Sequence, residues 1–236
     1  MNKRAAACFV AVAILGIVSV LALRENHDID DYQGEIAAIT EALKSKNSAE
    51  VDKILGRQVS QGRYGKIEEA TKNYVKDLLK VTDEMRELRD SDDLYTLLDG
   101  KNLKEDDEEL SASKRKAEKL RQEADKIIEE YNAINDNAAS IYLKGHDEEA
   151  QGLFNTAIDD IIESDYDAKN YVSTKALVSS TIDTYSEALD YLAKHRNAWT
   201  VKNNSLDFTS SSAQKEYQKI LDKAADAHNK ELSSAQ

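Results

Sequence analysis

Apolar residues recur every three or four positions through most of the chain beyond residue 28, and polar residues occupy the positions between them. This spacing gathers the apolar side chains on one face of an α-helix. Where it continues over several heptads, it predicts long helices that pack at shallow angles, as in coiled coils and bundles. The expected helices cover residues 30–46, 48–60, 64–90 (or 64–98), 106–144, 147–164, 166–200 and 212–233.

Two details of the pattern favour a bundle over a lone two-stranded coil. Second apolar stripes occur on several of the expected helices, so each of these helices has two neighbours. In the 106–144 helix, alanine recurs on the apolar face at Ala117, Ala124 and Ala138, where a small side chain lets a neighbouring helix approach closely. The pattern therefore predicts an elongated helical bundle or an array of helical hairpins.

Turn and capping residues separate these helices. Asn47 or Ser48 is suited to cap the helix that follows it, and Gly100 is suited to end a helix in the left-handed conformation. Gly145 turns the chain between two further helices. Trp199, near the end of its expected helix, is interpreted as a cap on the core rather than as a binding hot spot.

The N-terminal segment has a different pattern. A basic stub at residues 1–4 precedes an uncharged apolar run at residues 5–23, which at ~1.5 Å per residue nearly spans the ~30 Å hydrocarbon core of a bilayer. Because the basic end normally stays in the cytoplasm, we expect a single-pass signal anchor in the cell membrane, followed by an extracytoplasmic all-helical domain at residues 24–236. Residues 99–109 are the expected hinge, and no break divides this domain in two.

A cleaved signal peptide is the alternative interpretation. Small residues at Val20-Leu21-Ala22 are suited to cleavage after Ala22, which would leave a secreted or periplasmic protein. The apolar run is longer than the roughly 7–15 residues usual in a signal peptide, and this length favours the anchor. Cys8 is the only cysteine and lies inside the run, so no intramolecular disulfide is expected.

Composition supports the helical interpretation and narrows the range of partners. The chain contains no proline and only 8 glycines, too little turn chemistry for a β-rich domain. Its 45 acidic residues outnumber 32 basic ones, for a net charge of −13, which disfavours nucleic acid and anionic lipid headgroups as partners. The acidity suits basic partners or divalent cations, but solvated helix faces are the favoured explanation.

The sequence contains no recognisable catalytic, cofactor or metal motif. No two of the four histidines lie three or four residues apart, as a metal-binding pair on a helix would. The acidic run at residues 105–109 does not match a calcium loop and instead fits a helix N-terminus, where it opposes the macrodipole. Nucleophile elbows, phosphate loops and dinucleotide fingerprints do not occur. We therefore expect no enzyme activity, no cofactor and no metal.

One stretch, residues 132–165, resembles a single tetratricopeptide repeat. Small and aromatic residues stand at the spacings of that family: Tyr142, Gly145, Ala150, Phe154 and Ala157, with Ala138 and Ala139 in the preceding small positions. The stretch departs from the family at Asn135, where tryptophan is preferred, and at Glu163, where proline is preferred. No second copy follows, and stacked arrays need about three repeats. The resemblance implies a helical hairpin that binds a protein or peptide.

Together these observations predict an all-α protein with an N-terminal transmembrane helix and an extracytoplasmic bundle. The favoured function is a non-enzymatic scaffold or adaptor that binds a protein or peptide partner in the cell envelope. The candidate partner-binding residues on the hairpin are Tyr142, His146, Glu149 and Asn155. The alternative is an extracytoplasmic ligand-sensing bundle that signals through a membrane partner. The sequence leaves the oligomeric state open.

Overall fold

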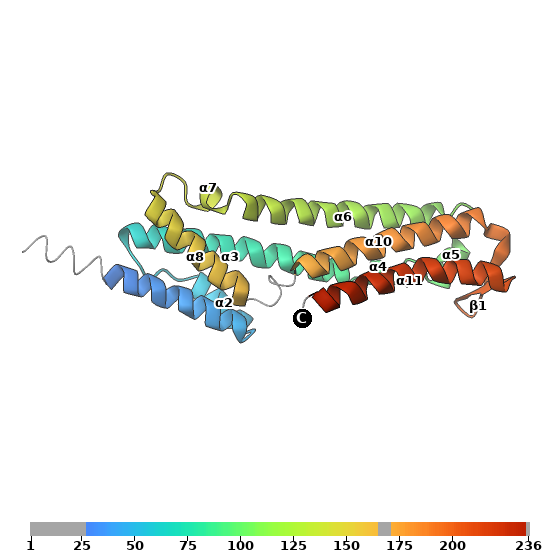
Figure 1. Ribbon diagram of the computed structural model, residues 1–236, viewed down its shortest axis with the longest axis horizontal. Coiled ribbons are helices and arrows are strands. Elements are labelled where there is room, and N and C mark those ends of the chain that lie inside the picture. The colour runs from blue at the N-terminus through green and yellow to red at the C-terminus, as the bar shows by residue number, and fades with distance from the viewer. Residues whose placement is uncertain (1–26, 165–170, 235–236) are drawn as a thin grey trace, which may run out of the picture. The chain divides into compact units, whose positions relative to one another are not determined.

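The computed structural model describes residues 27–164 and 171–234 (Figure 1), and in these residues the chain is mostly helical. The all-α prediction is confirmed, apart from one short β-hairpin. A first helix covers residues 27–44. It is followed by α2 (Ser48–Leu55), α3 (Gly62–Arg89), α4 (Asp92–Tyr95), α5 (Gly100–Glu105), α6 (Ser111–Asp136), α7 (Ala138–Tyr142), α8 (Glu148–Ser164), α10 (Tyr171–Lys194), the 3₁₀ turn η1 (Arg196–Ala198), β1 (Trp199–Lys202), β2 (Ser205–Phe208) and α11 (Ser211–Ser234).

The second expected helix starts as predicted but ends early. Asn47 caps α2, and its side chain accepts a hydrogen bond from the backbone of the first turn. The helix ends at Leu55 and not at residue 60, because the backbone of the following segment forms hydrogen bonds outside the helix. The backbone N–H groups of Val59 and Ser60 donate to the carboxylate of Glu68 instead of continuing the helical ladder.

The helix expected over residues 106–144 begins later and is broken in two. The carboxylates of Asp106 and Asp107 accept hydrogen bonds from backbone N–H groups in the first turn of α6, which starts at Ser111. The prediction that this acidic run lies at a helix N-terminus is therefore confirmed for Asp106 and Asp107, whereas Glu105 is the last residue of α5. At its other end α6 stops before Asn137, whose φ of −139° is not helical, and α7 begins after it.

Breaks at Ser91, just before Gly100 and at Gly145 separate consecutive helices. Ser91 caps α4, so the longer alternative of a helix from 64 to 98 is wrong. Gly145 has a φ of 77° and turns the chain as predicted. The prediction for Gly100 is wrong, since it is the first residue of α5 and not a left-handed helix end. Glycine is needed there because a Cβ would lie 2.5 Å from the carbonyl oxygen of Asn204.

A β-hairpin replaces the end of the helix expected over residues 166–200. Helix α10 ends at Lys194, and strands β1 and β2 pair in antiparallel register with Trp199 opposite Phe208. Asn203 and Asn204 form the two-residue connection with φ values of 51° and 61°, which is the geometry that hairpin turns prefer. The indole of Trp199 is buried and its Nε1 donates to the Leu192 carbonyl at 2.8 Å, so its expected role in the core is confirmed.

The contacts divide the chain into two compact units. Of the described residues, unit 1 contains 27–77 and 137–164, and unit 2 contains 78–136 and 171–234. The sequence pattern did not reveal this division. Its first boundary falls inside the continuous helix α3, where no turn residue marks it.

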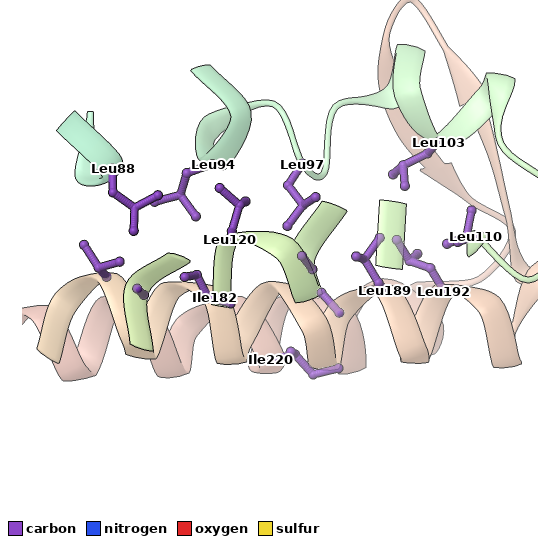
Figure 2. Packing of buried hydrophobic residues seen from close by; sticks show 14 of the residues in the cluster. Leu88, Leu94, Leu97, Leu103, Leu110, Leu120, Ile182, Leu189, Leu192 and Ile220 are labelled. Carbon is purple, nitrogen blue, oxygen red and sulfur yellow. The ribbon is translucent and has the colours of Figure 1, made fainter. Parts of the chain in front are cut away.

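The core of unit 2 consists of aliphatic side chains from α6, α10, α11, the end of α3 and the short helices α4 and α5 (Figure 2). Helix α10 packs against both α6 and α11, and α5 packs against the hairpin. The small residues Ala117 and Ala124 are buried on the contact face of α6, as predicted. The labelled core residues are Leu88, Leu94, Leu97, Leu103, Leu110, Leu120, Ile182, Leu189, Leu192 and Ile220.

The core of unit 1 is built by the first helix, α2, the first half of α3, α7 and α8. Its aromatic centre is Tyr74, which is fully buried and meets Phe154 and Tyr142 edge-on, with ring centroids 6.2 and 5.7 Å apart. Edge-to-face pairs add to the stabilisation that comes from burial alone. These contacts hold α7 and α8 on α3.

Within residues 27–164 and 171–234, no helix combines the length and the apolar character needed to cross a bilayer. The cytoplasmic stub expected at residues 1–4 and the transmembrane helix expected at residues 5–23 lie outside the described residues.

Candidate functional site

A groove of about 720 Å³ lies between the first helix and α8 in unit 1. Both helices are found at one end of Figure 1, the first in blue and α8 in gold. Part of the groove is apolar and is lined by Tyr32, Ile36, Leu153 and Ala157. Ligand sites are most often concave surfaces of this mixed kind, so this groove is the candidate site.

The amphipathic pattern of the first helix produces the groove. Tyr32, Ile36 and Ile39 lie on the face that is buried in the core of unit 1. The groove occupies the flank of that face, where Ala37 is exposed and Thr40 is half-buried. Because these two side chains are short, the flank remains open instead of being filled by the helix itself.

The charges of the groove are concentrated toward the C-terminal ends of its two helices. Glu41 and Lys44 line it from the first helix, and Asp160 and Glu163 line it from α8. All four residues are exposed. Three carboxylates and one ammonium group leave this part of the groove acidic.

A buried ionic network connects the first helix to α3. The Lys72 ammonium donates to Glu35 at 2.6 Å, to Glu68 at 2.7 Å and to the backbone carbonyl of Arg57 at 2.7 Å. The Arg57 guanidinium also binds Glu35, with Nε 2.9 Å from Oε1. Side chains of Lys72, Glu35 and Glu68 are each at most 3 % exposed. Two carboxylates and two cations thus balance inside unit 1.

The network keeps its carboxylates ionised and fixes one wall of the groove. Burial opposes ionisation of Glu35, but hydrogen bonds from Arg57 and Lys72 outweigh it, so the pKa of Glu35 lies below its ordinary value. For Glu68, burial is likewise outweighed by Lys72 and by the backbone of Ser60 and Val59, which lowers its pKa. The network joins the first helix to α3 and to the segment after α2, and its role is therefore structural.

Acid is expected to destabilise unit 1 through these two carboxylates. Because the pKa of Glu35 and Glu68 is lower in the folded chain than the ordinary 4.5, their stabilisation is present above that value and is lost as the pH falls below it and through the folded pKa. Urea denaturation followed by circular dichroism at about pH 7, 5, 4 and 3 should show a decline that begins below about pH 4.5. The decline should be shallower in Glu68→Gln than in the exposed control Glu69→Gln. Equal declines in the two variants would contradict this account.

The residues that the sequence proposed for partner binding do not line the groove. The Tyr142 hydroxyl donates to Asp77 at 2.7 Å, and its ring packs against the core. The Glu149 carboxylate is paired with Arg63, 3.0 Å away. The backbone carbonyl of His146 accepts from a neighbouring side chain, and Asn155 is exposed on α8.

Within unit 1, the segment that resembles a tetratricopeptide repeat forms a hairpin with unequal arms. Its first arm is only the five-residue helix α7, because residues 132–136 are the end of α6 and belong to unit 2. The second arm is the 17-residue helix α8, which buries Ala150, Phe154 and Ala157 as the family's spacing implies. The hairpin contributes α8, and hence one wall, to the groove.

Unit 2 contains smaller hollows. One of about 290 Å³ lies beside Glu84, Glu87 and Glu123, and another of about 270 Å³ lies beside Asp106 and Lys116. Among the residues that the structure describes, no group of three or more histidine, cysteine, aspartate or glutamate side chains is placed to hold a metal ion.

The sequence indicated little of this site. Glu68 and Lys72 form an i, i+4 pair that the sequence does display. Their partner Glu35 is 37 residues from Lys72, and no local pattern connects the two. Comparison of the chain with protein family models, with curated proteins and with solved structures finds no match.

Proposed function

We propose that this chain is a non-enzymatic, membrane-anchored protein of the cell envelope that binds a protein partner in the groove between residues 27–44 and α8. The observation that carries the proposal is the groove itself, which combines an apolar part with a charged part on rigid helical walls. Sites on packed helices are more precisely positioned than sites on loops. The ionic network behind the first helix adds to that rigidity.

The hairpin at residues 132–165 supports the same proposal. Its resemblance to a tetratricopeptide repeat suggests a protein-binding module, and its longer helix α8 forms one wall of the groove. The groove therefore gives a more specific location for binding than the exposed residues of the hairpin turn.

The proposed anchor is the apolar run at residues 5–23, with the described units on the extracytoplasmic side. Mass spectrometry of the mature protein tests this part of the proposal. Recovery of peptides from residues 1–23 supports a retained anchor, whereas a mature N-terminus just after Ala22 would show that the segment is a cleaved signal peptide.

Filling the groove is expected to remove the partner. Ala37→Trp places a bulky ring on an exposed position that lines the groove. Crosslinking of the full chain in its native membrane, followed by quantitative mass spectrometry, should show that partners of the wild-type protein fall by about tenfold or more in this variant. The control is Asp159→Trp, an exposed position on α8 that does not line the groove.

Three outcomes decide the proposal. Loss of the same partners in Ala37→Trp but not in Asp159→Trp supports the groove. Retention of every partner in Ala37→Trp would refute it. Loss in Asn155→Trp with retention in Ala37→Trp would refute the groove and move the binding site to the outer face of the hairpin.

A further inference from the structure

The walls of the groove restrict the conformation of whatever binds there. Both walls are α-helices, whose backbone N–H and C=O groups are bonded within each helix except in its first and last turns. An extended peptide in this groove would find no strand edge with which to pair its own backbone, and unpaired polar groups are costly to bury. A helical segment satisfies its backbone internally and meets no such cost. The walls therefore favour binding of a helical segment over binding of an extended peptide.

The length of the groove sets the length of that helix. Its lining residues on the first helix follow one another at intervals of four, at Tyr32, Ile36, Thr40 and Lys44. On α8 they extend from Leu153 to Ser164 over a similar distance. Each wall thus offers about three turns, or roughly 18 Å. A helix of three to four turns with apolar residues at i, i+3/i+4 and i+7 would match it.

The direction of the two walls gives the groove an electrostatic polarity. The Tyr32 hydroxyl donates to the Leu153 carbonyl at 3.3 Å, which joins the N-terminal halves of both helices. In Figure 1 the blue helix and gold α8 also run in the same general direction. Both helix C-termini, each carrying a partial negative charge, therefore lie at the same end of the groove.

The charged side chains reinforce this polarity. Glu41, Asp160 and Glu163 lie at the C-terminal end of the groove, and among the described residues that line the groove Lys44 is the one base. The opposite end is lined by Tyr32, Gln33 and Leu153, none of which carries a charge, and the Tyr32 hydroxyl is bonded to the Leu153 carbonyl as described above. One end is therefore acidic and the other is uncharged.

We infer that the groove binds an amphipathic helix of three to four turns from a protein partner, with its apolar side chains on the groove floor and its lysine or arginine side chains at the acidic end. This inference rests on the proposed function and names the chemistry of its partner. Complementary charge would both orient this helix and accelerate its association. The net charge of −13 further favours a basic segment over a second copy of this chain.

The inference is tested with the full chain in detergent micelles and a set of synthetic peptides of about 14 residues. The first peptide is an amphipathic helix with lysines at one end. The second carries glutamates in place of the lysines, the third has a central proline, and the fourth has the composition of the first in a scrambled, non-amphipathic order. Isothermal titration calorimetry measures their binding. Only the first should bind, and its affinity should decrease as the salt concentration rises.

Charge reversal in the groove provides the matched control. Asp160→Lys reverses a lining residue, and Asp159→Lys reverses its exposed neighbour, which does not line the groove. Asp160→Lys should weaken the first peptide roughly tenfold, and Asp159→Lys should weaken it only about twofold or less. Equal effects of the two reversals would overturn the inference. Equally tight binding of the acidic, proline or scrambled peptide would also overturn it.

These results can be separated from the test of the proposed function. If Ala37→Trp removes native partners but the basic amphipathic peptide does not bind, the groove remains a binding site and the inferred chemistry of its partner is wrong. If Ala37→Trp leaves every native partner in place, the proposed function fails first, and the inference fails with it.

Discussion

Replacing Lys72 by methionine is expected to lower the free energy of unfolding by about 3–5 kcal/mol. The Lys72 ammonium is 3 % exposed and lies 2.6 Å from Glu35 and 2.7 Å from Glu68. Methionine has similar length and no charge, so Glu68 would lose its only cationic partner among the contacts described and would remain buried. Removing one member of a buried ion pair is costly because the remaining charge is uncompensated.

The size of this effect should depend on pH. Protonation of Glu35 and Glu68 removes the charges with which Lys72 interacts, so the difference in stability between Lys72→Met and wild type should shrink as the pH falls below about 4.5. Urea denaturation followed by circular dichroism measures both values. The matched control is Lys76→Met, one turn later on α3 and exposed, which should change stability by about 0.5 kcal/mol or less. Equal losses in the two variants would show that the network does not stabilise unit 1.

Replacing Trp199 by alanine is expected to cost about 3–5 kcal/mol. The side chain is 1 % exposed and belongs to the core of unit 2, and the guanidinium carbon of Arg196 lies 4.1 Å from the centre of its ring. Its removal creates a large cavity and leaves the Leu192 carbonyl without the indole N–H that it accepts at 2.8 Å. The cavity and the lost hydrogen bond both lower the free energy of unfolding.

Two further variants separate the contributions of Trp199. Trp199→Phe keeps most of the buried ring and removes the hydrogen bond, so its loss in stability should be clearly smaller than that of Trp199→Ala. Val172→Ala, at a position that is 67 % exposed, should be nearly neutral. Thermal and urea denaturation followed by circular dichroism compare all three. A loss below about 1 kcal/mol in Trp199→Ala would contradict the described packing.

Local patterns predicted much of the secondary structure. Asn47 caps a helix because its side chain accepts a bond from the following turn, and Asp106 and Asp107 act in the same way before α6. Gly145 adopts the positive φ that its position between two helices requires. Each of these features depends on residues within about one helical turn, and the sequence displays such neighbours directly.

The β-hairpin was missed although the sequence contains a signal for it. Trp199, Val201 and Leu206 alternate with polar residues on either side of Asn203 and Asn204, which is the pattern of a hairpin with a two-residue turn. The spacing of the preceding residues predicts a helix that continues through this alternation. Strands of four residues are too short to outweigh a helical pattern that continues for many turns.

The ionic network and the groove could not have been predicted from local patterns. Glu35 pairs with Arg57 across 22 residues and with Lys72 across 37. In an acidic, helical chain, many charged residues show the same local pattern as these but face solvent. Only the packing of the first helix on α3 distinguishes them, and the same packing places Ala37 beside α8 to form the groove.

The chain contains a single tryptophan, and its burial in unit 2 makes that unit spectroscopically distinct. Indole emission therefore reports on unit 2 alone, while unit 1 contributes only tyrosine signal. Circular dichroism reports on the helices of both units. If the emission and dichroism curves coincide during denaturation, the two units unfold as one cooperative system, and if they separate, each unit has its own stability.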